Sequence, residues 1–244
     1  MRRHLSQFTV FREQLVCCNS MRVGFEPHSL LGEIRVKMPF ADPASRRAFL
    51  RESTRLLHQE LDAAASGIDL RHPADYAAML LDHAHALVPL EFRLERSGVE
   101  TILPDWNLRC RREALKADLS GLGQAMPPMT PATHEDTMPA FTRSEAFGVL
   151  YVLEGARLGG AVLARLVLSS WSEMVRANNR YFSHGQGAGF WPDFLERLET
   201  APDLVMDDVL AGAKIAFAAF LAASRSTRIV HPEDHAEAAA SNLQ

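Results

Sequence analysis

Cysteine is scarce in this chain of 244 residues, which contains only Cys17, Cys18 and Cys110. An odd number of cysteines without regular spacing argues against a secreted disulfide framework, and the lack of a Cys-x-x-Cys pair argues against a zinc ribbon. The N-terminal segment has no signal-peptide pattern, because Arg12 and Glu13 interrupt any apolar region. We therefore expect a reducing, cytoplasmic location.

An excess of charge is also missing, since 26 lysine and arginine residues stand against 30 aspartate and glutamate residues. This balance gives no basic footprint for a nucleic acid. A long uncharged apolar run is missing too. The most apolar stretch, residues 146–171, contains Glu154, Arg157 and Arg165, whose charges would be unfavourable in lipid. We predict that this stretch is a buried helix and that the protein has no membrane partner.

Strand patterns are absent as well, and apolar residues recur instead at helical spacing from residue 42 onward. Asp42 is the expected N-cap of the first helix, with Pro43 at its first position, and Gly67 is the expected stop. A proline kink is expected at Pro89 in the second helix. We predict an all-α single domain with helices over about 42–66, 73–97, 106–119, 142–171, 192–199 and 204–224.

Three segments complete the predicted domain organisation. Residues 1–40 lack helical periodicity, and we interpret them as a disordered N-terminal extension, with a short ordered hairpin as the alternative. Residues 41–228 form the predicted domain, and residues 229–244 form a flexible tail. Within the domain, residues 121–141 and the glycine-rich residues 183–190 are predicted loops.

The first predicted helix carries chemically useful residues on one face. Arg51, Arg55, His58 and Asp62 stand at positions i, i+4, i+7 and i+11. Imidazole is a common axial ligand of heme iron, a carboxylate one turn away can orient it, and a guanidinium can pair with a heme propionate. The alternative for this segment alone is an ordinary solvated face with His58 at its edge.

The helix predicted from residue 142 is rich in glycine at Gly148, Gly155, Gly159 and Gly160. Each glycine in a helix interior destabilises it by about 1 kcal/mol relative to alanine, so close backbone approach is expected there. Two explanations remain open. One is helix packing through Gly155-x-x-x-Gly159, and the other is a flat ligand lying on the backbone.

Taken together, these segments resemble the heme oxygenases, most closely the bacterial group associated with bacteriophytochromes. The resemblance covers about residues 42–225. Its motifs are Thr54-Arg-Leu-Leu-His-Gln-Glu-Leu-Asp62, Tyr151-Val-Leu-Glu-Gly-Ala-Arg-Leu-Gly-Gly160 and Tyr181-Phe-Ser-His-Gly185.

The resemblance implies a helical bundle with heme between the first helix and the glycine-rich distal helix. In that family the equivalent of His58 is the proximal iron ligand, and Gly155 and Gly159, with Gly160 beside them, match the positions where the distal helix bends over heme. Arg51 stands where the family often has a basic residue. Arg180 and Tyr181 are further candidates for binding the heme propionates.

The same resemblance implies an activity and a set of partners. Heme is both cofactor and substrate, and it is cleaved to biliverdin, carbon monoxide and ferrous iron with O2 and external electrons. The electron donor would be a ferredoxin, a flavodoxin or a reductase, and a bacteriophytochrome is a possible receiver of biliverdin.

One position departs from the family pattern. Mammalian members carry an aspartate directly after the first glycine of the distal motif, where this chain has Ala156. Proton delivery would then need other groups, with Arg157 and Glu154 as candidates. Two alternatives therefore stay open: a protein of the same fold that binds heme or another tetrapyrrole without degrading it, and a helical interaction module without cofactor.

The remaining candidate residues have simpler interpretations. His83 and His85 lie at i and i+2, so a shared metal is not expected. His184 is either near a ligand or a loop cap. Cys110 lies among arginines that could lower its pKa, but no partner base is evident. We interpret it as a plain helix cysteine or as part of an electropositive docking face for an acidic ferredoxin or flavodoxin. That face would be formed by Arg109, Arg111 and Arg112.

Overall fold

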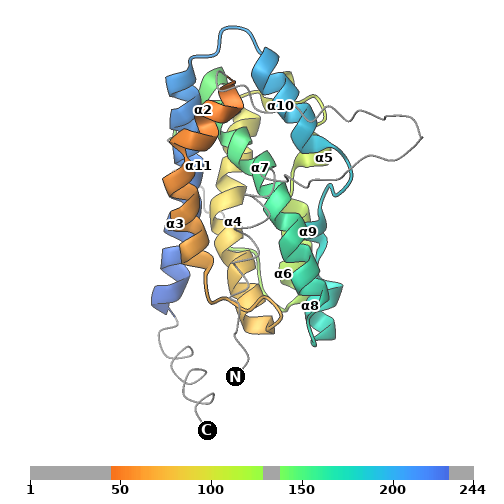
Figure 1. The fold of residues 1–244 in the computed structure, drawn as a ribbon. Helices are drawn as coiled ribbons and strands as arrows, with labels where there is room; N and C mark the ends of the chain where they lie inside the picture. Colours follow the sequence, from red (N-terminus) through yellow and green to blue (C-terminus); the bar gives the residue numbers. More distant parts are fainter. Residues whose placement is uncertain (1–44, 129–137, 231–244) are drawn as a thin grey trace, which may run out of the picture.

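The computed structural model describes residues 45–128 and 138–230, and all regular structure in these two ranges is helical (Figure 1). This confirms the predicted all-α class. The predictions for residues 1–40 and for the tail beyond residue 230 lie outside the described residues. The helices are α2 (Arg46–Ser53), α3 (Arg55–Ala65), α4 (Pro73–Arg96), the 3-10 turn η1 (Val99–Thr101), α5 (Trp106–Arg109), α6 (Arg112–Gly121), α7 (Arg143–Leu168), α8 (Glu173–Ala177), α9 (Arg180–Ser183), α10 (Phe190–Thr200) and α11 (Met206–Val230).

The long helices α4, α7 and α11 form the centre of the bundle, with α11 packed along both others and along α3. Glycine permits the closest of these approaches. A Cβ atom at Gly148 of α7 would lie 1.8 Å from the carbonyl oxygen of Val209, and one at Gly212 of α11 would lie 2.0 Å from that of Glu145. Because no side chain could fit at either position, Gly148 and Gly212 set the distance between α7 and α11.

Local signals account for the ends of the central helices. Thr142 and Glu145 form a capping box at the start of α7, in which Thr142 Oγ1 accepts from the Glu145 amide (3.2 Å) and the Glu145 carboxylate accepts from the Thr142 amide (2.7 Å). Helix α4 begins at Pro73 and ends before Gly98, whose φ of 69° is left-handed. Pro89 lies inside α4, which continues through it as one helix, and the kink there stays a prediction.

The first predicted helix is divided into α2 and α3 at Thr54. The N-cap of α2 is Ser45, whose side chain accepts from the Ala48 amide, and the predicted start at Asp42 and Pro43 lies outside the described residues. The Thr54 hydroxyl donates to the Leu50 carbonyl at 2.8 Å, a side-chain bond that competes with the helical pattern and bends helices.

The third predicted helix is divided as well, into α5 and α6. The carboxylate of Glu91 on α4 accepts from the amides of Arg111 (2.7 Å) and Arg112 (3.2 Å), so the chain at the break is bound by a distant side chain. The sequence pattern around residue 110 contains no sign of this contact. The short helices α8 and α9, in a segment where we predicted no helix, were also missed.

The helices that carry the two candidate segments, α3 and α7, both pack on α11 but make little contact with each other. In Figure 1, α3 (orange) and α7 (green) flank the more distant α4. Helix α7 is long and apolar enough to cross a membrane by length and composition alone, yet half of the relevant window is buried inside the bundle. Its burial agrees with its prediction as a core helix.

Candidate functional site

Helix α3 places His58 and Asp62 one turn apart and in direct contact. The imidazole Nδ1 lies 3.0 Å from a carboxylate oxygen of Asp62, and the two side chains are 44% and 37% exposed. This hydrogen bond raises the pKa of His58, against a smaller opposing effect of burial. Because Nδ1 is engaged, Nε2 is the atom of His58 that remains available, and it has no hydrogen-bond partner among the described residues.

His58 lies at the boundary between the core and the surface. Its ring meets Phe217 of α11 edge-on, with 6.1 Å between centroids, and Leu57 and Leu61 pack against the core beside it. On the outer side of α3, Leu56 is exposed. His58 and Asp62 thus lie together on one face of α3, whereas Arg51 lies on α2, before the break at Thr54.

The arginines near His58 differ in whether their side chains have a partner. Arg55 pairs with Glu52 at 3.2 Å, whereas Arg51 is exposed and has no hydrogen-bond partner among residues 45–128 and 138–230. Arg47, one turn before Arg51, was not a sequence candidate, although its i, i+4 spacing could have identified it. Burial raises the pKa of Tyr151 in α7, and the charges of Arg47 and Arg51 oppose this rise. The two cations of α2 are therefore close enough to this phenol to affect its charge.

The glycines of α7 serve different purposes. Gly148 is a packing position against α11, as described above. Gly160 is another, because its Cβ would lie 3.3 Å from the carbonyl oxygen of Phe182. A Cβ at Gly155 would lie 3.4 Å from Trp191, an ordinary van der Waals distance. Gly155 and Gly159 are both partly exposed, so helix packing alone does not account for them.

A buried ionic cluster lies behind this glycine segment. Glu154, only 1% exposed, accepts from Arg109 Nη1 (3.1 Å) and from Arg157 Nη2 (2.8 Å). Arg109 also donates to the carbonyl oxygen of Phe190 (2.9 Å) and to Asp193 (2.5 Å), and these contacts join α5, α7 and α10. Burial and Arg111 lower the pKa of Arg157, while Glu154 opposes them. Glu154 and Arg157, the two sequence candidates for proton delivery, are therefore engaged with each other and with Arg109.

The predicted electropositive docking face does not exist. Arg109 and Arg111 are only 2% and 5% exposed, and Arg112 pairs with Glu95 at 2.7 Å. The possibility that Cys110 has a lowered pKa was wrong as well. Burial and Glu91, whose carboxylate lies 2.8 Å from the thiol, raise the pKa of Cys110 to about 12. Both errors have one cause, since acidic side chains from distant helices meet these arginines in the interior.

The remaining candidates contact α4, α6 and α7. Arg180 is largely exposed and reaches Asp118 of α6 at 3.2 Å. Tyr181 is buried, and its hydroxyl lies 2.9 Å from Nδ1 of His83 on α4. His184 Nδ1 lies 3.3 Å from Arg157, and burial together with Arg157 lowers the pKa of His184. These contacts give Arg180 and Tyr181 structural partners, and their role in binding propionates stays a prediction.

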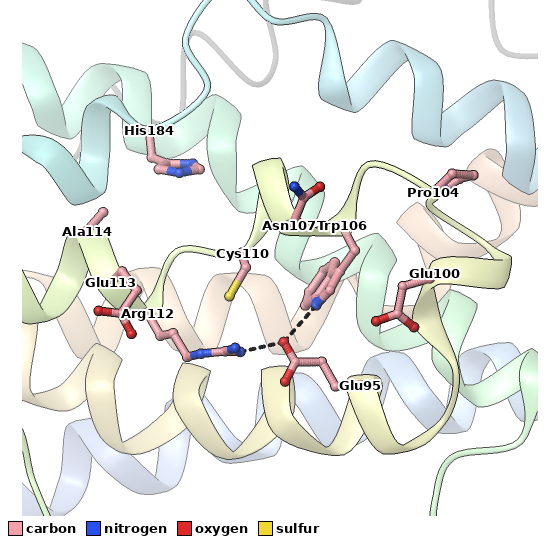
Figure 2. A pocket seen from close by; sticks show the side chains of 10 residues that line it. All are labelled: Glu95, Glu100, Pro104, Trp106, Asn107, Cys110, Arg112, Glu113, Ala114 and His184. Carbon is pink, nitrogen blue, oxygen red and sulfur yellow. Dashed lines mark hydrogen bonds and ion pairs between the residues drawn. The ribbon is translucent and has the colours of Figure 1, made fainter.

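A shallow pocket of about 510 Å³ lies elsewhere, over α5 and the start of α6 (Figure 2). Figure 2 shows Glu95 accepting from both Trp106 and Arg112 at its base, with Cys110 between them and His184 on the far side. No residue of α3 or α7 lines it. The pocket is therefore separate from α3 and α7, the helices that carry His58 and the partly exposed glycines.

Comparisons with known proteins agree with this arrangement. No protein-family profile matches the sequence. Two solved structures have the same fold: a heme oxygenase from Neisseria meningitidis, described with NO and CO bound, and a heme oxygenase from Leptospira interrogans. Each has a TM-score of 0.56 and 18% identity, and the matches cover 75% and 74% of this chain and 92% and 98% of those chains. The architecture is thus the all-helical fold of the heme oxygenases.

Sequence identity extends the likeness beyond the fold. A heme oxygenase of Xanthomonas campestris pv. campestris (strain 8004) is 31% identical over 149 residues, which span 59% of this chain and 86% of that protein. The chain belongs to the heme oxygenase family of enzymes.

Proposed function

We propose that this protein cleaves heme to biliverdin, carbon monoxide and ferrous iron with O2 and external electrons, and that His58 Nε2 is the proximal iron ligand. One observation carries the assignment of the ligand. The His58–Asp62 hydrogen bond of 3.0 Å engages Nδ1 and leaves Nε2 unpartnered on a half-exposed ring. Metal-binding histidines usually have this arrangement, with the second nitrogen bonded to a carboxylate or carbonyl.

Asp62 determines which tautomer the imidazole of His58 adopts. A carboxylate accepts hydrogen bonds only, so the proton of neutral His58 lies on Nδ1 and the lone pair lies on Nε2. The same bond fixes the rotation of the ring about Cβ–Cγ. Asp62 is therefore a positioning residue for His58, and it also makes the imidazole a more basic ligand.

Heme, when bound, supplies the iron at which O2 is activated and the porphyrin ring that is cleaved. The chain supplies a cationic end to the site. The guanidinium groups of Arg47 and Arg51 have no hydrogen-bond partner among the described residues, and both influence the charge of Tyr151 in α7. These two guanidinium groups and the phenol suit the two propionates of heme, which would set the rotation of the ring in the site.

Helix α7, on the opposite side of the proposed site, leaves room for heme. Gly155 and Gly159 are partly exposed on α7 and have no side chain, so a flat ring and a small diatomic molecule can approach the backbone there. The buried cluster of Glu154, Arg109 and Arg157 holds this part of α7 in place from behind. Gly155 and Gly159 accordingly act by leaving room for the ring, Gly160 beside them packs against Phe182, and His58 acts as a ligand.

The partners and location of the enzyme belong to the same proposal. We place it in the cytoplasm, with a ferredoxin, a flavodoxin or a reductase as electron donor. With Arg109 and Arg111 buried, the donor would dock near the exposed Arg51 of α2, close to the proposed propionates. A bacteriophytochrome as receiver of biliverdin rests on the sequence resemblance alone.

Turnover of bound hemin tests the activity. The purified protein, loaded with hemin and supplied with a reductase system and O2, is expected to lose its Soret band, gain a biliverdin spectrum and release carbon monoxide. Catalase in the assay excludes coupled oxidation by free peroxide. A hemin complex that keeps its spectrum under these conditions, with an active heme oxygenase as positive control, would overturn the proposed activity.

A further inference from the structure

His83 is a largely buried histidine that the proposed chemistry has not used. It lies on α4, where α9 and α11 meet, and its Nδ1 is 2.9 Å from the Tyr181 hydroxyl. Aromatic rings surround it edge-on: the centroids of Tyr181, Phe182 and Phe220 lie 5.4, 5.7 and 5.4 Å from that of His83. These contacts hold the imidazole in one orientation.

The second ring nitrogen of His83 is unpartnered but not fully buried. Nε2 has no hydrogen-bond partner among the described residues. Asn179 Oδ1 is the only fully buried unpartnered side-chain atom among them, so Nε2 keeps some access to solvent. An unpaired polar atom buried away from water is unfavourable, and here that is avoided because Nε2 reaches accessible space. The side chain is partly exposed although protein surrounds it on several sides.

Packing contacts connect His83 to both α3, which carries His58, and the glycine-rich α7. Phe217 and Phe220 stand at i and i+3 on α11, so they share one face. His58 meets the first ring at 6.1 Å and His83 meets the second at 5.4 Å. On its other side His83 contacts Phe182, whose carbonyl oxygen lies against Gly160 of the glycine helix. A chain of contacts thus leads from the histidine wall through His83 to the glycine wall.

Hydrogen bonding determines which tautomer His83 adopts. Burial and the nearby charge of Arg111 lower the pKa of His83 to about 3, so the ring is neutral at physiological pH. Tyr181 has no acceptor other than His83 among the described residues, so its hydroxyl proton is best placed toward Nδ1. The His83 proton is then on Nε2, which is a hydrogen-bond donor that Tyr181 does not engage.

We infer that His83 donates the hydrogen bond on the oxygen side of heme that the family aspartate organises elsewhere and that Ala156 cannot provide, and that Tyr181 is a positioning residue for it. The inference rests on the proposed heme site at His58. Glu154 and Arg157 do not fill this role, because each is engaged in the buried ionic cluster.

Carbon monoxide bound to the reduced heme protein is a direct probe of such a donor, since its stretching frequency falls when a donor polarises it. Relative to the unchanged protein, His83→Leu is expected to move the C–O band to higher frequency. His83→Gln, which keeps a donor, is expected to restore most of the shift. Tyr181→Phe releases Nδ1, and the band is expected to broaden or split as both tautomers become populated.

His85→Gln is the matched control, because His85 is an exposed histidine on the same helix, and its C–O band should not move. If His83→Leu does not fold, the phenylalanine variant still decides the question. An unchanged band in Tyr181→Phe, and in His83→Leu where it folds, would overturn the role of His83 while leaving heme binding intact. A protein that gives no specific hemin spectrum at all would instead overturn the proposed site.

Discussion

The two walls of the site are built in opposite ways. The histidine helix α3 has no buried residue of its own, and its functional pair, His58 and Asp62, is half-exposed and formed within one turn of sequence. The glycine-rich helix α7 is deeply packed. Its own Glu154, next to Gly155, is bound by Arg109 of α5 and by Arg157 of α7. The orientation of His58 thus depends on a contact within one helical turn, whereas the position of α7 depends on contacts between residues distant in sequence.

This difference has a physical consequence. A half-exposed ion pair contributes little to the free energy of unfolding, because water screens it. Removing one member of a buried pair leaves charge without compensation and is strongly destabilising. Mutations in α3 should therefore affect function far more than stability, and mutations in α7 should affect both.

The largest stability effect is expected for Glu154→Gln. Arg109 and Arg157 would lose their shared carboxylate in a site that is 1% exposed, and the free energy of unfolding should fall by about 3 kcal/mol or more. Urea unfolding followed by circular dichroism measures this. A loss below about 1 kcal/mol would show that the buried cluster does not stabilise α7.

Two glycine-to-alanine substitutions in α7 should have different effects on the free energy of unfolding. Gly148→Ala places a methyl group on the Val209 carbonyl and should destabilise the protein by about 2 kcal/mol. Gly155→Ala meets Trp191 at an ordinary distance, so in the heme-free protein it should be neutral or gain up to about 1 kcal/mol from helix propensity. Thermal unfolding of both variants checks the pair. Equal destabilisation would mean that Gly155 is also a packing position.

The pH dependence of stability tests whether His83 is buried in its neutral form. The folded-state pKa of His83, about 3, lies below the unfolded value of 6.5, so the unfolded chain binds more protons between these values. The stability of the native state is then full above about pH 6.5 and falls as the pH drops toward 3. The lowered pKa of His184 acts in the same direction.

Removing His83 should reduce this acid sensitivity. We expect His83→Gln to have a urea midpoint that falls less between pH 6.5 and pH 4.5 than that of the unchanged protein. Parallel midpoints over this range would show that His83 is not buried as a neutral group.

The smallest stability effect is expected for Asp62→Asn, at or below about 1 kcal/mol, because the pair is half-exposed. Its effect on function should be larger. Losing the carboxylate that orients His58 should weaken the iron–imidazole bond and reduce hemin affinity or activity about 10- to 100-fold. Hemin titration beside urea unfolding separates the two, and a stability loss equal to that of Glu154→Gln would contradict the contrast between the walls.

Features encoded within a turn or two were predictable from sequence. The capping box at Thr142, the stop at Gly98 and the His58–Asp62 pairing all follow from short spacings. Other features depend on contacts between distant residues. The break between α5 and α6 comes from Glu91, some 20 residues away, and the burial of Arg109 depends on Glu154 and Asp193. A single sequence does not show which distant residues come into contact, so the sequence alone places Arg109 and its neighbours on the surface.

The identity of the iron ligand is the central claim, and one titration tests it. Hemin is added to the unchanged protein, to His58→Ala and to His85→Ala, and the Soret band is recorded with and without free imidazole. We predict a specific band in the unchanged and His85→Ala proteins, its loss in His58→Ala, and its recovery there when imidazole fills the vacated position. An unaltered band in His58→Ala without imidazole would show that His58 is not the iron ligand.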